Sequence, residues 1–72
     1  MDWMYDQQTR NWKLAAGEWR ATVRRLMDSD AWLGVVERTG SHHERFESEN
    51  FQWPHDGRAW CEAEIARLAS RS

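Results

Sequence analysis

The sequence has a single cysteine, a single proline and a single lysine, and it has no long apolar run. Because Cys61 has no second cysteine within the chain, an intrachain disulfide is excluded and a reducing, cytoplasmic setting is expected. No stretch approaches the roughly 18 apolar residues that a membrane-spanning helix requires, and no signal-peptide pattern follows Met1. We therefore expect a cytoplasmic protein without a membrane partner.

The chain also lacks the excess positive charge that is typical of nucleic-acid-binding domains. Ten basic and twelve acidic residues give it a net charge of −2. All but one of the cations are arginines, which suit planar, paired or stacked contacts better than lysines do. The net charge thus argues against DNA binding, whereas the type of cation does not.

Tryptophan, by contrast, is abundant, with six in 72 residues. A chain of this length forms one domain with a marginal core, which small proteins often reinforce with disulfides or a metal ion. Here large aromatic side chains can supply stabilising buried area instead. We expect most of the tryptophans to lie in the core, which is too small to hide all six.

Alternating residues predict strands in the first two thirds of the chain. Residues 1–11 show no clean period and are interpreted as an N-terminal arm, followed by a single domain over residues 12–72. Gly17 indicates a turn or bulge, after which Trp19 and Val23 share one parity and Arg20 and Arg24 the other. A second strand is expected in residues 31–38.

A third apolar run contains Phe46 and Phe51, which are five residues apart and cannot share a face of a regular strand. A bulge, or a strand end near Ser48, would reconcile them. From Pro54 onward the pattern is helical, with an apolar stripe made of Cys61, Ile65 and Leu68. The predicted fold is α+β: a small antiparallel sheet of three to four strands packed against one C-terminal α-helix.

The parity of the 31–38 strand decides which residues could bind a partner. If Leu33 and Val35 face the helix, Trp32 and Val36 form an outward apolar strip beside arginines. If the other parity is buried, the strip does not exist, and the adjacent valines leave both alternatives open. Tryptophan and arginine dominate binding hot spots. The candidate partner-binding residues are therefore Trp32, Arg20, Arg24 and Val36.

The motif "GEWRATVRR…AWLG" in residues 17–34 resembles the core of AP2/ERF DNA-binding domains, and integrase arm-binding domains are similar in their strands-then-helix order. The matching positions are Gly17, Trp19, Ala21, Val23, Arg24, Trp32, Leu33 and Gly34. The resemblance implies that an exposed sheet face enters the DNA major groove, that Arg24 and Trp32 contact the duplex, and that Trp19, Ala21 and Val23 pack on the helix.

Metal-ligating and nucleophilic residues are sparse and poorly placed for chemistry. Neighbouring strand residues point to opposite faces, so His42 and His43 are a poor chelating pair, and His55 lies further along the chain. Cys61 lies on the apolar helix stripe, where a buried and inert thiol is usual. We expect no metal and no cofactor.

Two pairs of carboxylates at spacing i, i+2 are candidates for acid–base catalysis: Asp28 with Asp30, and Glu47 with Glu49. Such catalysis also needs a pocket that shifts one pKa of the pair, and a sheet-plus-helix domain of this size has little room for one. Turn and surface charges are the preferred interpretation, so we expect no catalytic residues and no enzyme activity.

These observations favour a non-enzymatic protein-interaction module that uses either the sheet face around Trp32 or an aromatic arm around Trp3 and Tyr5. Self-association is one form of this function, since a marginal core gains from a partner. The alternative is a sheet-face DNA-binding domain of the AP2/integrase-arm type, which the acidic residues 37–49 disfavour. A small bacterial or phage accessory protein would fit both functions.

Overall fold

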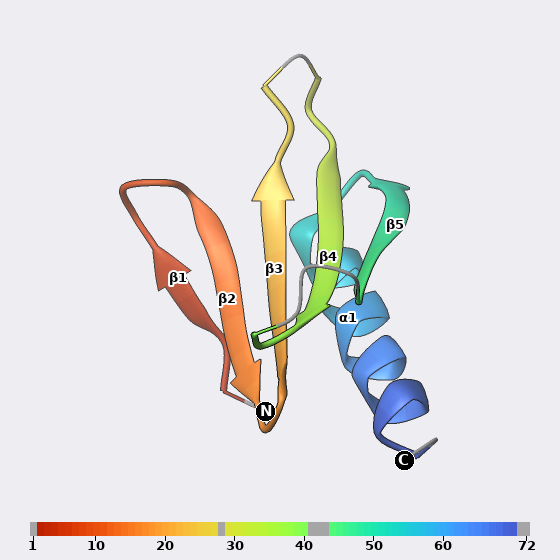
Figure 1. The fold of residues 1–72 in the computed structure, drawn as a ribbon. Coiled ribbons are helices and arrows are strands. Elements are labelled where there is room, and N and C mark those ends of the chain that lie inside the picture. Colours follow the sequence, from red (N-terminus) through yellow and green to blue (C-terminus); the bar gives the residue numbers. More distant parts are fainter. Residues whose placement is uncertain (1, 28, 41–43, 71–72) are drawn as a thin grey trace.

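The computed structural model of the protein describes residues 2–27, 29–40 and 44–70. Within these residues it has five strands and one helix: β1 (Met4–Asp6), β2 (Asn11–Ala16), β3 (Trp19–Arg25), β4 (Trp32–Arg38), β5 (Arg45–Phe51) and α1 (Pro54–Ala69) (Figure 1). The strands form one antiparallel sheet in sequence order, β1-β2-β3-β4-β5. The α+β fold with a C-terminal helix is confirmed.

The sheet has more strands than the three to four that the sequence predicted. The segment expected as an arm contains β1, whose residues pair with β2 in the register Met4↔Lys13 and Tyr5↔Trp12. Tyr5 also packs on Trp12, with ring centroids 4.9 Å apart. A strand of three residues carries no periodic signal in the sequence, so these contacts, and not local pattern, fix β1 in place.

The turn predicted at Gly17 is a two-residue hairpin loop between β2 and β3, because Ala16 pairs directly with Trp19. Gly17 has φ +62°, in the left-handed region that glycine adopts without steric cost. The loop sets the register in which Leu14 lies opposite Ala21 on one side of the sheet.

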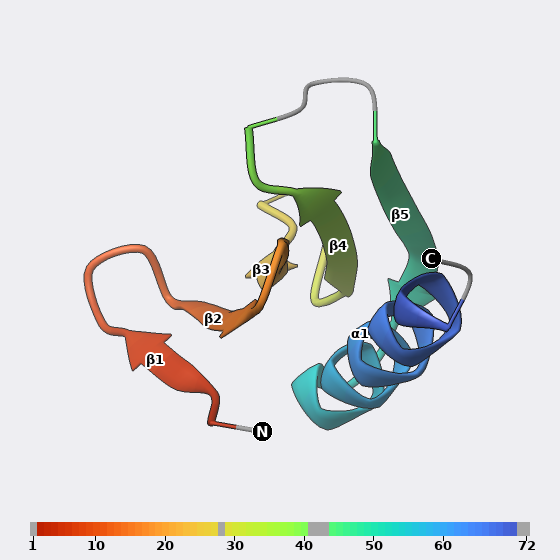
Figure 2. The same cartoon turned by 60° about the horizontal axis from the view of Figure 1, so that its bottom comes forward.

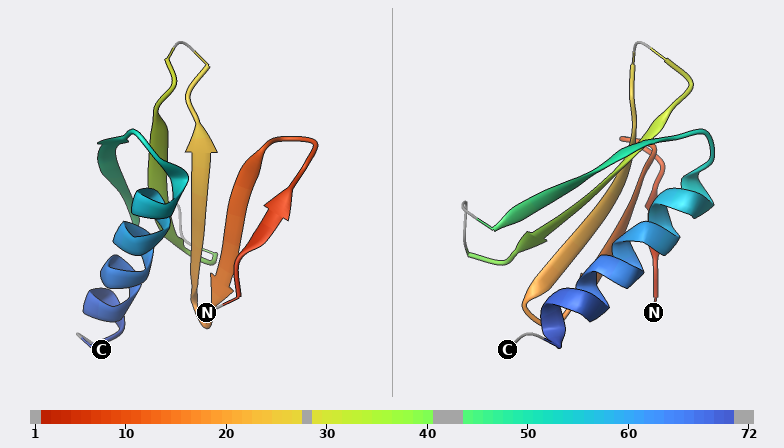
Figure 3. Two further views of the ribbon diagram at one scale, coloured as in Figure 1. Left: turned by 180° about the vertical axis from the view of Figure 1, so that it is seen from behind. Right: turned by 90° about the vertical axis from the view of Figure 1, so that its right-hand side faces the viewer.

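The helix covers one face of the sheet, over β3, β4 and β5, and no element formed by the described residues covers the other face (Figures 2 and 3). Val23 and Val36 are fully buried between sheet and helix, and Trp19 packs at the margin of this core. The remaining core residues are Leu14, Ala21, Cys61, Ile65 and Leu68. The helix stripe that the sequence predicted is thus the buried one.

The third apolar run forms β5 with the predicted irregularity. The pairing with β4 shifts between Leu33 and Val35, so that one extra residue is accommodated on β5. Phe46 therefore lies opposite Val36 and Phe51 opposite Trp32, both on the helix side. The side chain of Ser48 occupies the gap, where its hydroxyl oxygen accepts a hydrogen bond from the Gly34 amide at 2.8 Å. Of the two predicted alternatives, the structure has the bulge, and the strand continues past Ser48 to Phe51.

Aromatic residues close the edge of the core beside β1 and β2. The indole Nε1 of Trp3 donates to Oε2 of Glu62 on α1 at 3.3 Å. The guanidinium of Arg58 stacks on Trp12, 4.3 Å from the ring centroid. These contacts tie the N-terminal strands to the helix although α1 itself lies over β3–β5. The only helix among the described residues, α1, is neither long nor apolar enough to span a membrane.

Candidate binding face

Trp32 and Val36 lie on the helix side of the sheet, so the predicted outward strip does not exist. In the β3–β4 register Val23 pairs with Gly34 and Ala21 with Val36, which gives all four residues the same face. Val36 is 0% exposed, and Trp32 packs against the core. The alternative in which Leu33 and Val35 face the helix is therefore wrong.

Gly34 provides the physical reason why Trp32 and Val36 face the helix. A Cβ atom at this position would lie 3.0 Å from Cε3 of Trp60, 3.1 Å from Sγ of Cys61 and 3.3 Å from the carbonyl oxygen of Gly57. The helix thus approaches β4 so closely at Gly34 that only a residue without a side chain fits. Once Gly34 faces α1, Trp32 and Val36 must face it too, because strand side chains alternate.

We call the opposite side of the sheet the outer face. By the register, Arg20 and Arg24 lie on it, as the sequence predicted. Their companions from the other strands are Met4, Asp6, Asn11, Lys13, Ala15, Thr22, Leu33, Val35, Glu37, Arg45, Glu47 and Asn50. Val35 is only 4% exposed even here, since longer neighbouring side chains surround it. The outer face is mixed in charge, with cations and carboxylates interleaved.

Most of the carboxylates on this face have cationic neighbours. Lys13 Nζ lies 3.6 Å from Oδ2 of Asp6, and Arg45 lies at the same distance from Glu47. The backbone amide of Gln8 donates to Asp6 at 3.0 Å, and this hydrogen bond, with a smaller contribution from Lys13, lowers the pKa of Asp6. Such exposed pairs contribute little stability.

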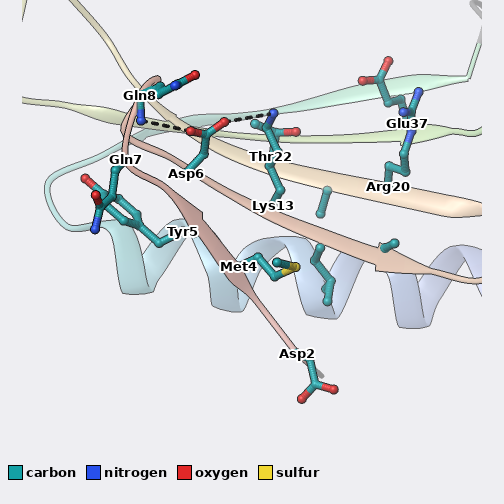
Figure 4. A pocket seen from close by; sticks show the side chains of 13 residues that line it. Asp2, Met4, Tyr5, Asp6, Gln7, Gln8, Lys13, Arg20, Thr22 and Glu37 are labelled. Carbon is teal, nitrogen blue, oxygen red and sulfur yellow. Dashed lines mark hydrogen bonds and ion pairs between the residues drawn. The ribbon is translucent and has the colours of Figure 1, made fainter.

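A hollow of about 890 Å³ opens on the outer face beside β1. We call it the β1 hollow; Figure 4 shows Arg20 with Glu37 at one end, Gln7 and Gln8 at the other, and Met4 and Lys13 between them. The Met4 side chain is 74% exposed, although it projects from a strand of the sheet. The sequence did not single out Met4 or Lys13, because it gave no signal that residues 4–6 would form a strand.

A second, smaller hollow of about 300 Å³ adjoins the first, and the two share Thr22 and Glu37. We call it the Arg24 hollow. Its remaining lining residues are Thr9, Asn11, Arg24, Arg25, Met27, Val35 and Arg45. The outer face therefore has an apolar-lined end near Met4 and an arginine-lined end near Arg24.

The other chemical candidates are dispersed. Cys61 is buried, and burial raises the pKa of its thiol to about 12. His55 pairs with the neighbouring Asp56 on the surface. Among residues 2–27, 29–40 and 44–70, no three His, Cys, Asp or Glu side chains come together in a way that would hold a metal ion.

The described members of the two carboxylate pairs have neighbours of their own. Asp30 forms an ion pair with Arg25 at 2.9 Å, and Glu47 pairs with Arg45. Glu49 lies at the bulge of β5. The predictions for Asp28, His42 and His43 fall outside the described residues.

No protein-family model matches the chain, and no curated protein or solved structure is significantly similar to it. A function must therefore be inferred from the fold and from the chemistry of the outer face.

Proposed function

We propose that the chain is a non-enzymatic protein-interaction module whose partner binds the outer face across the β1 hollow. The observation that carries the proposal is the position of Met4, which is 74% exposed in a hollow bordered by Lys13 and Arg20. Methionine and arginine are enriched in protein interfaces, where the flexible thioether adapts to a partner's surface. The interleaved charges would then fix the orientation of the partner.

A cytoplasmic location belongs to the same proposal. It is supported by the free, buried thiol of Cys61, which suits a reducing compartment. The partner is either another protein or a second copy of this chain.

DNA binding by the outer face is the second candidate. In its favour, Arg20 and Arg24 lie on that face, where the resemblance to AP2/ERF domains would have Arg24 contact the duplex. Against it, Asp6, Glu37 and Glu47 lie on the same face. A duplex carries one phosphate charge per roughly 1.7 Å of its axis, so it would meet these carboxylates wherever it lay. Trp32, the other expected contact, lies on the helix side.

The test is affinity capture from the source lysate with three charge variants, each first checked for an unchanged thermal midpoint. We expect Met4→Glu and Arg20→Glu to lower retention of a nuclease-resistant partner by about tenfold, which corresponds to about 1.4 kcal/mol. Arg67→Glu makes the same change of charge as Arg20→Glu on an exposed position of α1 and should retain the partner.

Sedimentation of the purified protein and of the same variants at increasing concentration tests whether the partner is a second copy of the chain. In the capture experiment, a partner that is lost equally from all three variants, or from none of them, would contradict the proposal. Binding of random duplex at about 0.15 M salt that Arg20→Glu abolishes would favour the DNA candidate instead, because phosphate contacts are the salt-dependent part of such binding.

A further inference from the structure

Within the described part of the chain, Arg24 differs from the other cations of the outer face in having neither an ion pair nor a carboxylate directly opposite it on a neighbouring strand. Its cross-strand partner on β4 is Leu33, and none of the described residues forms a hydrogen bond or ion pair with its guanidinium. Arg20, by comparison, lies directly opposite Glu37, and Arg45 lies opposite Glu37 from the other side. The register therefore places an apolar residue opposite Arg24, where Arg20 and Arg45 have a carboxylate.

The surroundings of Arg24 are those of an anion-binding site. Thr22 and Asn11 line the same hollow, and their side chains can donate hydrogen bonds, whereas the side chain of Thr9 is already bonded to Asp6. Arg25 and Arg45 add positive charge, although their guanidinium groups are already paired with Asp30 and Glu47. Glu37 is the one acidic residue in this lining, and arginines lie opposite it on both neighbouring strands.

We propose that the Arg24 hollow is a carboxylate-binding subsite that takes an Asp or Glu side chain of the partner protein. This inference rests on the proposed function and adds a chemical requirement to it: the partner's contact segment carries an acidic residue next to the apolar group that meets Met4. The planar fork of arginine matches a carboxylate with two parallel hydrogen bonds. A hollow of about 300 Å³ admits a single side chain.

A single carboxylate fits this face better than a phosphate backbone does. An isolated acidic side chain can reach Arg24 while its neighbours avoid Glu37 and Glu47, whereas a nucleic acid delivers a continuous row of charges.

The experiment is a nuclear magnetic resonance titration of the full chain, following the Nε–Hε signal of Arg24. The probes are the blocked tripeptides Leu-Glu-Leu and Leu-Gln-Leu, inorganic phosphate, and a short random DNA duplex. We expect saturable shifts with Leu-Glu-Leu, and binding of Leu-Gln-Leu about fivefold weaker, the scale of one exposed charge pair. Arg24→Gln should abolish the difference between the two tripeptides. Arg67→Gln, which removes a cation from α1, should preserve it.

Phosphate or duplex that shifts the Arg24 signal at lower concentration than Leu-Glu-Leu would overturn the proposal, and so would a difference between tripeptides that survives in Arg24→Gln. No shift with any probe would overturn it as well. Because the titration needs no natural partner, its failure is distinct from failure of the capture experiment with Met4→Glu and Arg20→Glu, which tests the proposed function itself.

Discussion

Replacing Gly34 by alanine tests whether α1 sits on β4 as closely as the structure shows. The new methyl group would lie 3.0 Å from the Trp60 ring, 3.1 Å from the Cys61 sulfur and 3.3 Å from the backbone oxygen of Gly57. All three distances are shorter than ordinary van der Waals contact, and two of the three atoms belong to a rigid ring or to backbone. Overpacking of this kind costs about 1–3 kcal/mol.

One effect opposes this cost. Alanine restricts the unfolded chain more than glycine does, which stabilises the folded state by about 0.4–1 kcal/mol where the backbone conformation allows it. Gly34 does not have a positive φ, so the gain applies. We expect a net loss of about 1–2 kcal/mol. For a domain of this size that corresponds to a thermal midpoint lower by about 4–16 °C.

Urea and thermal unfolding of Gly34→Ala, Cys61→Ala and the double variant would measure the effect and its cause. If the clash with Sγ contributes, removal of the sulfur gives the methyl group room, and the double variant should be more stable than the sum of the single losses by about 0.5–1 kcal/mol. A Gly34→Ala protein that is as stable as the parent, or more stable, would refute the close approach of α1 to β4. It would also refute the conclusion that Trp32 and Val36 face the helix.

Two further predictions concern the core. Val23→Asp should unfold the domain, because Val23 is 0% exposed and an unpaired buried charge costs more than a small domain's total stability. The control Thr22→Asp, on the outer face, should cost only about 1 kcal/mol. Equal thermal midpoints for the two variants would contradict the assignment of faces. The thiol of Cys61 should resist alkylation at pH 8 until urea unfolds the protein, since burial raises its pKa from 9.0 to about 12. The unfolded thiol then ionises first, so the contribution of Cys61 to stability should be constant below pH 9 and should be lost between pH 9 and 12; a Cys61→Ala protein that loses stability as steeply over this range would contradict the shift.

The sequence by itself determined those features that depend on the spacing of apolar residues along the chain. Alternation around Trp19 and Val23 predicted β3 and the face that it buries, and the stripe of Cys61, Ile65 and Leu68 predicted the buried side of α1. The spacing of Phe46 and Phe51 predicted either a bulge or a strand end near Ser48, because two side chains five apart cannot share a face of a regular strand, and the structure has the bulge. Arg20 and Arg24 followed as residues of the opposite face.

Local period could not determine the face of β4, because Val35 and Val36 are both buried, one under outer side chains and one under the helix. Contact with α1 decided it, through the space that Gly34 leaves for Trp60 and Cys61. The strand β1 was likewise decided by tertiary contacts, since Tyr5 and Trp3 are held by Trp12 and by Glu62 of α1. That Leu33 and not a carboxylate lies opposite Arg24 depends on the register between β3 and β4, which the sequence of neither strand shows by itself.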